Sequence, residues 1–148
     1  MGGLYTLFVD NGTQSTSNDA LTIIPASARS FELVEISIGG MATASAANST
    51  MVARSTGGTT PGGSVTARPH RVNQAAAGFT NATTWAAQPT SPQELVIIPW
   101  NANGGLYRWV RIPGDNIIFA DADTNKNLTV RGKTGTSAFS FHVMVEEF

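Results

Sequence analysis

The segment DADTNKN at 121–127 is the part of the sequence whose spacing is closest to that of a metal site. It carries oxygen-bearing side chains at alternate positions, as the start of an EF-hand calcium loop does: Asp121, Asp123, Asn125 and Asn127. Lys126 stands where such a loop needs glycine, and Gly132 stands where it needs a bidentate glutamate. We therefore expect a polar hairpin turn between two strands and no metal, with a weak calcium site as the alternative.

The two histidines, His70 and His142, have no acidic residue beside them in the sequence. His70 is close to Arg68 and Arg71, and His142 falls on the polar phase of the last predicted strand. Serines are numerous, but no G-x-S-x-G pattern accompanies them, and the carboxylates are few and scattered. The glycine pairs match neither of the common phosphate-binding patterns. We expect neither an enzyme nor a bound cofactor.

The aromatic side chains are the strongest candidates for a contact surface. Tyr107 and Trp109 share one phase of the strand LYRWVRI, with Arg111 beyond them, and Trp85 lies in a Thr- and Ala-rich loop. Aromatic residues and arginine are enriched in the cores of protein interfaces. Such a group of side chains binds sugar, stacks on bases, packs against another subunit, or fills the core of the fold. The sequence leaves these alternatives open.

Composition restricts the class of partner. Only 13% of the 148 residues are charged, about half of the ~25% usual in a globular domain, and the net charge is −1. We therefore expect no nucleic-acid partner, since binding to phosphate requires clustered lysine and arginine. The apolar runs, such as Leu95–Ile98, are far shorter than a membrane helix, and the N-terminus lacks signal-peptide features. We expect no membrane partner and synthesis in the cytoplasm.

Short β-rich runs separated by turns make up most of the chain, and no segment keeps a helical period. Phe31–Ile38 changes phase near Leu33 and Val34, which predicts a bulge. Ala138–Glu146 alternates between apolar and polar residues, whereas Glu94–Trp100 is continuously apolar, as in a strand covered on both faces. The other predicted strands are Leu4–Val9, Leu21–Ile24, Thr50–Ser55, Leu106–Ile112, Asn116–Ala120 and Leu128–Gly132. This pattern predicts one all-β domain, a sandwich or a barrel, over residues 1–148.

The chain as a whole resembles a known group of viral proteins. It lacks cysteine, has lysine only at Lys126 and Lys133, and is rich in Thr, Asn, Gly and Ala. It opens MGGLYTLFVDNGTQ, continues through RWVRIPGDNIIFADAD and ends in SFHVMVEEF. In these features it resembles the small jelly-roll structural proteins of tailed bacteriophages, most of all the head decoration, or cement, proteins.

The resemblance implies a two-sheet antiparallel jelly-roll sandwich of about eight strands with a short N-terminal arm. It also implies a homotrimer on the outer surface of the virion head, which binds the major capsid protein and stabilises the shell without catalysis. The alternative is a trimeric carbohydrate- or receptor-binding jelly-roll module, a lectin or a tail-fibre tip, with Trp85 or Trp109 exposed and calcium at Asp121 and Asp123.

The same resemblance suggests where the contacts lie. We expect the capsid contact in Leu4–Phe8 and in the glycine-rich loop at 55–69, because mobile segments can become ordered on binding. The candidate residues for capsid or subunit contact are Leu4, Tyr5, Leu7, Phe8, Trp85, Tyr107, Trp109 and Arg111.

Overall fold

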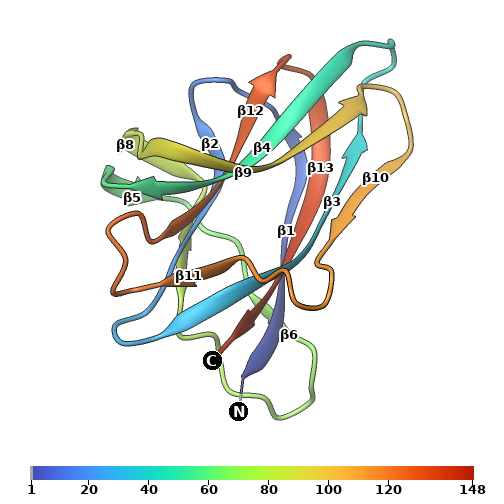
Figure 1. Ribbon diagram of the computed structural model, residues 1–148. Coiled ribbons are helices and arrows are strands. Elements are labelled where there is room, and N and C mark those ends of the chain that lie inside the picture. Colours follow the sequence, from blue (N-terminus) through green and yellow to red (C-terminus); the bar gives the residue numbers. More distant parts are fainter. Residues whose placement is uncertain (1) are drawn as a thin grey trace.

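The protein is a sandwich of two antiparallel β-sheets, seen in a computed structural model that describes residues 2–148 (Figure 1). Sheet A has the order β10 (Leu106–Val110), β3 (Ser30–Gly40), β13 (Ala138–Glu147), β1 (Gly3–Thr13) and β6 (Arg68–Pro69), with β11 (Ile118–Ala120) also paired to β3. Sheet B has the order β7 (Thr80–Ala82), β2 (Asp19–Ile24), β12 (Asn127–Thr134), β4 (Ala47–Thr56) and β9 (Thr90–Asn101). A separate ribbon pairs β5 (Thr59–Gly62) with β8 (Thr84–Ala87).

The predicted all-β sandwich is confirmed, and no helix occurs among residues 2–148. The predicted number of about eight strands is too low, since the described chain has thirteen. The predicted strand Asn116–Ala120 is present as the three-residue β11, and the four strands that were not predicted are only two to four residues long: β5, β6, β7 and β8. Strands this short give almost no alternation in the sequence, and two of them lie in the glycine-rich loop.

The hydrophobic core lies between the inner faces of the two sheets. Strand β13 shows the pattern most clearly, because Phe139, Phe141, Val143 and Val145 are buried while the residues between them are half-buried. The predicted alternation of this strand is confirmed. Across the core, the Trp100 ring of β9 stacks on Phe139 with ring centroids 5.5 Å apart.

The bulge predicted in β3 is confirmed at Val34. Leu33 pairs with Val145 and Glu35 pairs with Met144, which leaves Val34 as an extra residue between two pairs. The bulge lets the apolar residues on both sides of it reach the core in spite of the change of phase.

Two other predictions about strands and termini are wrong. Strand β9 is not covered on both faces, since Ile97 on its outer face is 49% exposed. A continuous apolar run does not reveal which face a neighbouring layer covers. The described residues also contain no N-terminal arm, because Gly3 already pairs with Glu147 in sheet A. The two termini consequently lie side by side at one end of the sandwich, near β6 (Figure 1).

Two adjacent glycines at the end of β3 allow a matched test of the packing. A Cβ atom on Gly40 would lie 2.3 Å from the carbonyl oxygens of Asn101 and Ala102, whereas a Cβ on Gly39 would meet nothing within 4 Å. We expect Gly40→Ala to cost about 1–3 kcal/mol, because backbone atoms must move, and to lower Tm by roughly 2–12 °C. Gly39→Ala is the control and should leave Tm nearly unchanged. Equal effects in a thermal melt would contradict the packing at this corner.

Candidate functional site: a depression on the outer face of sheet A

The outer faces of the two sheets differ in what covers them. Residues 85–89 cross over sheet B, where Trp85 Nε1 donates to Thr22 Oγ1 at 3.0 Å and Arg131 donates to the Pro89 carbonyl at 2.8 Å. Sheet B exposes an apolar side chain at its edge, Ile97 of β9 at 49%, whereas sheet A exposes one on an inner strand as well, Phe8 of β1 at 50%, together with Leu106 of the edge strand β10 at 70%. The surface of sheet A is therefore the better candidate for binding.

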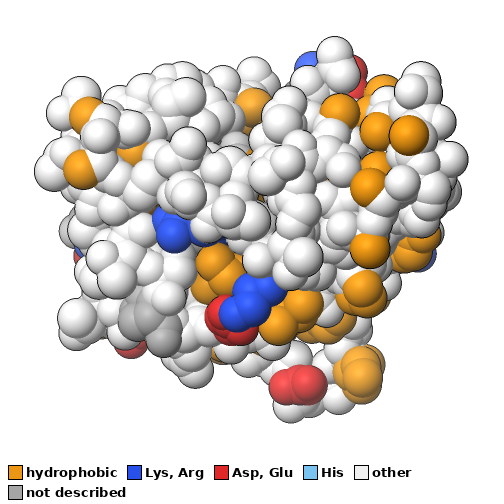
Figure 2. All heavy atoms as spheres, turned by 90° about the horizontal axis from the view of Figure 1, so that it is seen from above, with side chains coloured by type: hydrophobic (Ala, Val, Ile, Leu, Met, Phe, Trp, Pro, Cys, Tyr) orange, Lys and Arg blue, Asp and Glu red, His pale blue; other side chains and the backbone are white. Residues whose placement is uncertain are grey.

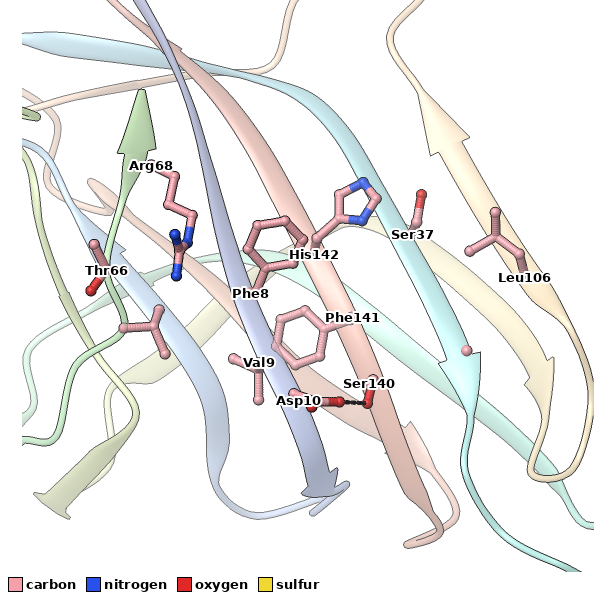
Figure 3. Close-up of a pocket in the computed structure, with 12 residues that line it drawn as sticks. Phe8, Val9, Asp10, Ser37, Thr66, Arg68, Leu106, Ser140, Phe141 and His142 are labelled. Atoms are coloured by element: carbon pink, nitrogen blue, oxygen red, sulfur yellow. Dashed lines mark hydrogen bonds between the residues drawn. The ribbon is translucent and has the colours of Figure 1, made fainter. Parts of the chain in front are cut away.

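A depression of about 840 Å³ lies on this face and is called here the sheet A depression (Figure 3). Small residues of the two central strands line its floor, namely Ser37 and Gly39 of β3 and Ser140 of β13. Phe8 of β1 and Leu106 of β10 stand on the strands that flank β3 and β13. Large side chains on the outer strands and small ones between them thus create the hollow.

A buried carboxylate organises the polar groups beside the depression. Glu35 is only 7% exposed, although it points to the outer face of the sheet. Its Oε2 bonds to Arg108 at 2.5 Å, and its Oε1 accepts from Ser37 Oγ at 2.9 Å and lies 2.9 Å from His142 Nε2. The hydrogen bond from Arg108 lowers the pKa of Glu35 to about 2, with the bonds from His142 and Ser37 acting in the same direction and burial acting against them.

The group of Glu35, Ser37 and His142 is not arranged for nucleophilic catalysis. In a catalytic triad the serine donates to the histidine, and the acid contacts the other nitrogen of the ring. Here Ser37 donates to Glu35 itself, and the same oxygen contacts His142 Nε2. The arrangement fixes a negative charge and orients the imidazole, as in a structural network.

Other polar groups at the depression remain available to a ligand. Asp10 Oδ1 accepts from Ser140 Oγ at 2.7 Å, and Ser140 Oγ accepts from the Asn11 backbone N–H at 2.8 Å. Arg68 of β6 lines the same depression, and no ion pair within residues 2–148 involves it or Asp10. The Phe8 ring lies against the His142 ring with centroids 5.8 Å apart.

The contact residues predicted in Leu4–Phe8 fall on both faces of β1. Tyr5 and Leu7 lie in the core, at 3% and 0% exposure, so they offer no surface to a partner. Leu4 is half-buried, and Phe8 is exposed on the outer face. The glycine-rich loop, predicted from a different part of the sequence, ends at β6, and its Arg68 lies with Phe8 at the sheet A depression.

The predicted aromatic residues are mostly engaged in packing. Tyr107 and Trp109 are half-buried against the core, which was one of the alternatives for them, and Trp85 covers part of sheet B. Arg111 bonds to Glu32 at 2.6 Å and to Glu146 at 3.2 Å. These four side chains therefore do not form one surface.

The acidic segment at 121–127 does not form a hairpin turn. It connects β11 of sheet A with β12 of sheet B, so the strands on either side of it are not paired with each other. Asp121 bonds to Lys126 at 2.7 Å, which lowers the pKa of this carboxyl group, and it accepts from the Ala28 N–H at 3.1 Å. Within the described residues, no group of three or more His, Cys, Asp or Glu is placed to hold a metal ion.

Nothing in the sequence pointed to Asp10, Glu35 or the pairing of His142 with Glu35. The partners lie in distant strands, 107 residues apart for His142 and Glu35.

No helix of residues 2–148 is long and apolar enough to cross a membrane. Comparison with protein-family models, with curated proteins and with solved structures gives no match for this chain.

Proposed function

We propose that this protein is a non-enzymatic decoration protein of a tailed-bacteriophage head, a jelly-roll subunit that binds the outside of the shell as a trimer and stabilises it. The observation that carries the proposal is the order of the eight longer strands. Numbered along the chain, sheet A joins the sixth, third, eighth and first, and sheet B joins the second, seventh, fourth and fifth. This order supports a jelly roll, an architecture common among viral capsid and lectin domains.

Fold alone does not decide function, so a second observation is needed. Surface composition provides it and supports the same proposal. Figure 2 shows a face on which charged side chains are few and lie among uncharged polar and hydrophobic groups. With 13% charged residues, contacts with neighbours would depend little on salt-sensitive charge pairs. A protein that binds many identical positions on a shell gains affinity from multivalency and needs no deep pocket.

We propose that the subunits meet along the edge of sheet A. Leu106, Val110 and Ile112 are 70%, 42% and 68% exposed on and just after β10, and are called here the β10 strip. Strand β10 is an edge strand, so it presents unpaired backbone groups as well as apolar side chains. Both features favour contact with a second copy.

We propose that the end of the sandwich carrying the termini faces the shell. Val72 is 93% exposed and Phe148 is 54% exposed, and both line a depression of about 610 Å³. Leu4, a predicted contact residue, joins this end, because its carbonyl accepts from His70 N–H and from Gln74 Nε2. An exposed valine at a loop tip suits insertion between neighbouring capsid proteins.

The experiment that tests this function measures solution mass and binding to phage heads with the same samples. We expect a mass three times the chain's 15.5 kDa by light scattering, and cosedimentation with heads that lack the protein. Replacing Leu106 and Val110 together by serine should give monomers, since each apolar side chain removed from a contact costs about 1.5–3 kcal/mol. The monomers should also sediment poorly with heads, because they lose multivalency.

The matched control is Ile97→Ser, which removes an apolar side chain of similar exposure from sheet B and should leave both readouts unchanged. A wild-type monomer at 50 μM, or a protein that stays in the supernatant at every head concentration, would contradict the proposal.

A second candidate function, glycan binding, is favoured by one specific observation. The sheet A depression combines an exposed aromatic ring, Phe8, with polar groups that have few partners, Asp10 and Arg68. Sugar sites are usually concave, with an aromatic surface and a few placed polar groups. Trp85 and Trp109 do not favour this function, since both are half-buried.

A further inference from the structure

We propose that the sheet A depression binds a sugar residue that carries a carboxylate, such as a sialic acid or a uronic acid. The inference rests on the second candidate function and names its ligand class. It does not depend on whether the protein decorates a shell. The decoration proposal uses the β10 strip and the end of the sandwich that carries the termini, and only Leu106 belongs both to the β10 strip and to the rim of the sheet A depression.

The size and floor of the depression suit one or two sugar rings. Its volume of about 840 Å³ lies within the ~300–1,000 Å³ typical of small-ligand sites. A Cβ atom on Gly39 would meet nothing within 4 Å, which shows that the floor is open above this residue. A ligand can therefore approach the strands closely without displacing a side chain.

Phe8 provides the apolar surface that a sugar ring needs. Its ring is half exposed although it projects from the middle of a paired strand, and the neighbouring His142 ring supports it from one side. The electron-rich face of an aromatic ring attracts the weakly positive C–H groups on one face of a pyranose. His142 is itself held by Glu35, so the orientation of Phe8 is supported by a fixed network.

Asp10 and Ser140 select a ligand rich in hydroxyl groups. A carboxylate accepts hydrogen bonds but donates none, and among residues 2–148 the side-chain bond that Asp10 accepts comes from Ser140. The Asp10 side chain is exposed at the depression, where it lies beside Ser140 (Figure 3), so its carboxylate can accept further hydrogen bonds. Adjacent hydroxyls of a sugar can donate to this carboxylate, whereas a simple anion such as sulfate has no proton to donate and would be repelled.

Arg68 is the residue that would bind the carboxylate of the ligand. It lines the depression from β6, next to β1, and no ion pair within the described chain occupies its guanidinium. The planar guanidinium matches a carboxylate with two parallel hydrogen bonds. A neutral sugar would satisfy Asp10 and Phe8 but leave Arg68 unused, so an acidic sugar uses all three groups.

The experiment compares defined ligands by ligand-observed NMR and calorimetry on the full chain. The probes are sialyllactose, a glucuronic acid disaccharide, neutral lactose and a short glutamate peptide. We expect at least one acidic sugar to bind about tenfold or more tightly than lactose, as one charge-assisted hydrogen-bond pair provides. The two acidic probes distinguish sialic from uronic acid, and the peptide distinguishes a sugar site from an acidic protein partner.

Variants assign the contacts. Arg68→Gln should remove the preference for the acidic sugar over lactose, whereas Asp10→Asn and Phe8→Ala should weaken both sugars. Arg71→Gln, an exposed arginine outside the depression, is the matched control and should bind as the wild type does.

Three results would overturn the inference: no binding of any sugar at 10 mM, equal affinity for acidic and neutral sugars, or tighter binding of the glutamate peptide. A trimer that binds heads but no sugar would refute only this inference. A monomer that binds acidic sugar would refute only the decoration proposal.

Discussion

Replacing Asp19 by alanine is expected to lower the free energy of unfolding by about 3–5 kcal/mol, a large part of the ~5–15 kcal/mol typical of a domain. The Asp19 side chain is fully buried beneath residues 85–89, and it accepts from Thr22 Oγ1 at 2.6 Å, Thr129 Oγ1 at 3.0 Å and Arg131 Nε at 2.6 Å. Removing it leaves the Arg131 charge, 12% exposed, without its carboxylate. Denaturant titration followed by tryptophan fluorescence measures the loss.

The control for this prediction is Glu94→Ala, which breaks the exposed pair with Lys133. We expect it to cost no more than about 1 kcal/mol, because solvent screens such pairs. All variants must be compared at one protein concentration, since association would add to apparent stability. If Asp19→Ala cost no more than Glu94→Ala, the buried network would not stabilise sheet B as described.

Glu35 is expected to make the fold sensitive to acid. Its pKa is about 2 in the folded protein and 4.5 in the reference state, so its stabilising effect is complete above pH 4.5 and is lost as the pH falls through 2. Glu35→Gln should therefore be less stable than the wild type by on the order of 2–3 kcal/mol at pH 7, with the exposure of Arg108 reducing the effect. The difference should shrink toward zero between pH 5 and pH 2.

A double-mutant cycle separates this effect from that of other carboxylates. In an Arg108→Met background, Glu35→Gln should cost much less at pH 7, since the largest cause of the low pKa has been removed. A stability difference between wild type and Glu35→Gln that stays constant from pH 7 to pH 2 would contradict the assigned network.

Much of the fold could be predicted from the sequence because its long strands carry a strong period. Successive side chains of a strand point to opposite faces of the sheet, and one face is buried. The alternation in β13 and the phase change at Val34 are therefore both visible in the local sequence. Short strands such as β6 could not be predicted, since two residues carry no period. The pairing of β6 depends on β1, which is more than 50 residues away in the chain.

The errors have a common physical cause, the pairing of strands across long distances. The segment at 121–127 has the composition of a hairpin turn, but whether its flanking strands pair depends on β3, β2 and β4. The apolar run of β9 likewise does not reveal which face of the strand other parts of the chain cover, and Ile97 is left 49% exposed. Local sequence predicts that a strand forms but does not identify its partners.

The candidate site could be predicted only in part. Phe8 was a candidate because Leu4–Phe8 was expected to be a mobile segment that becomes ordered on binding; the segment instead belongs to strand β1, and the Phe8 ring is exposed on it. Asp10 and Arg68 look like ordinary turn and loop residues in the sequence. They become candidate ligand contacts only because the order of β13, β1 and β6 brings them to one depression.

The most direct test of the decoration proposal is the temperature at which phage heads release their DNA. Under the decoration proposal, tailed-bacteriophage heads that lack the protein would be prepared and then saturated with it. Because a cement protein clamps neighbouring capsid proteins against internal pressure, we expect release at a clearly higher temperature when the protein is bound, and no such rise with the Leu106 and Val110 double variant. Release at the same temperature with and without bound protein would contradict the account.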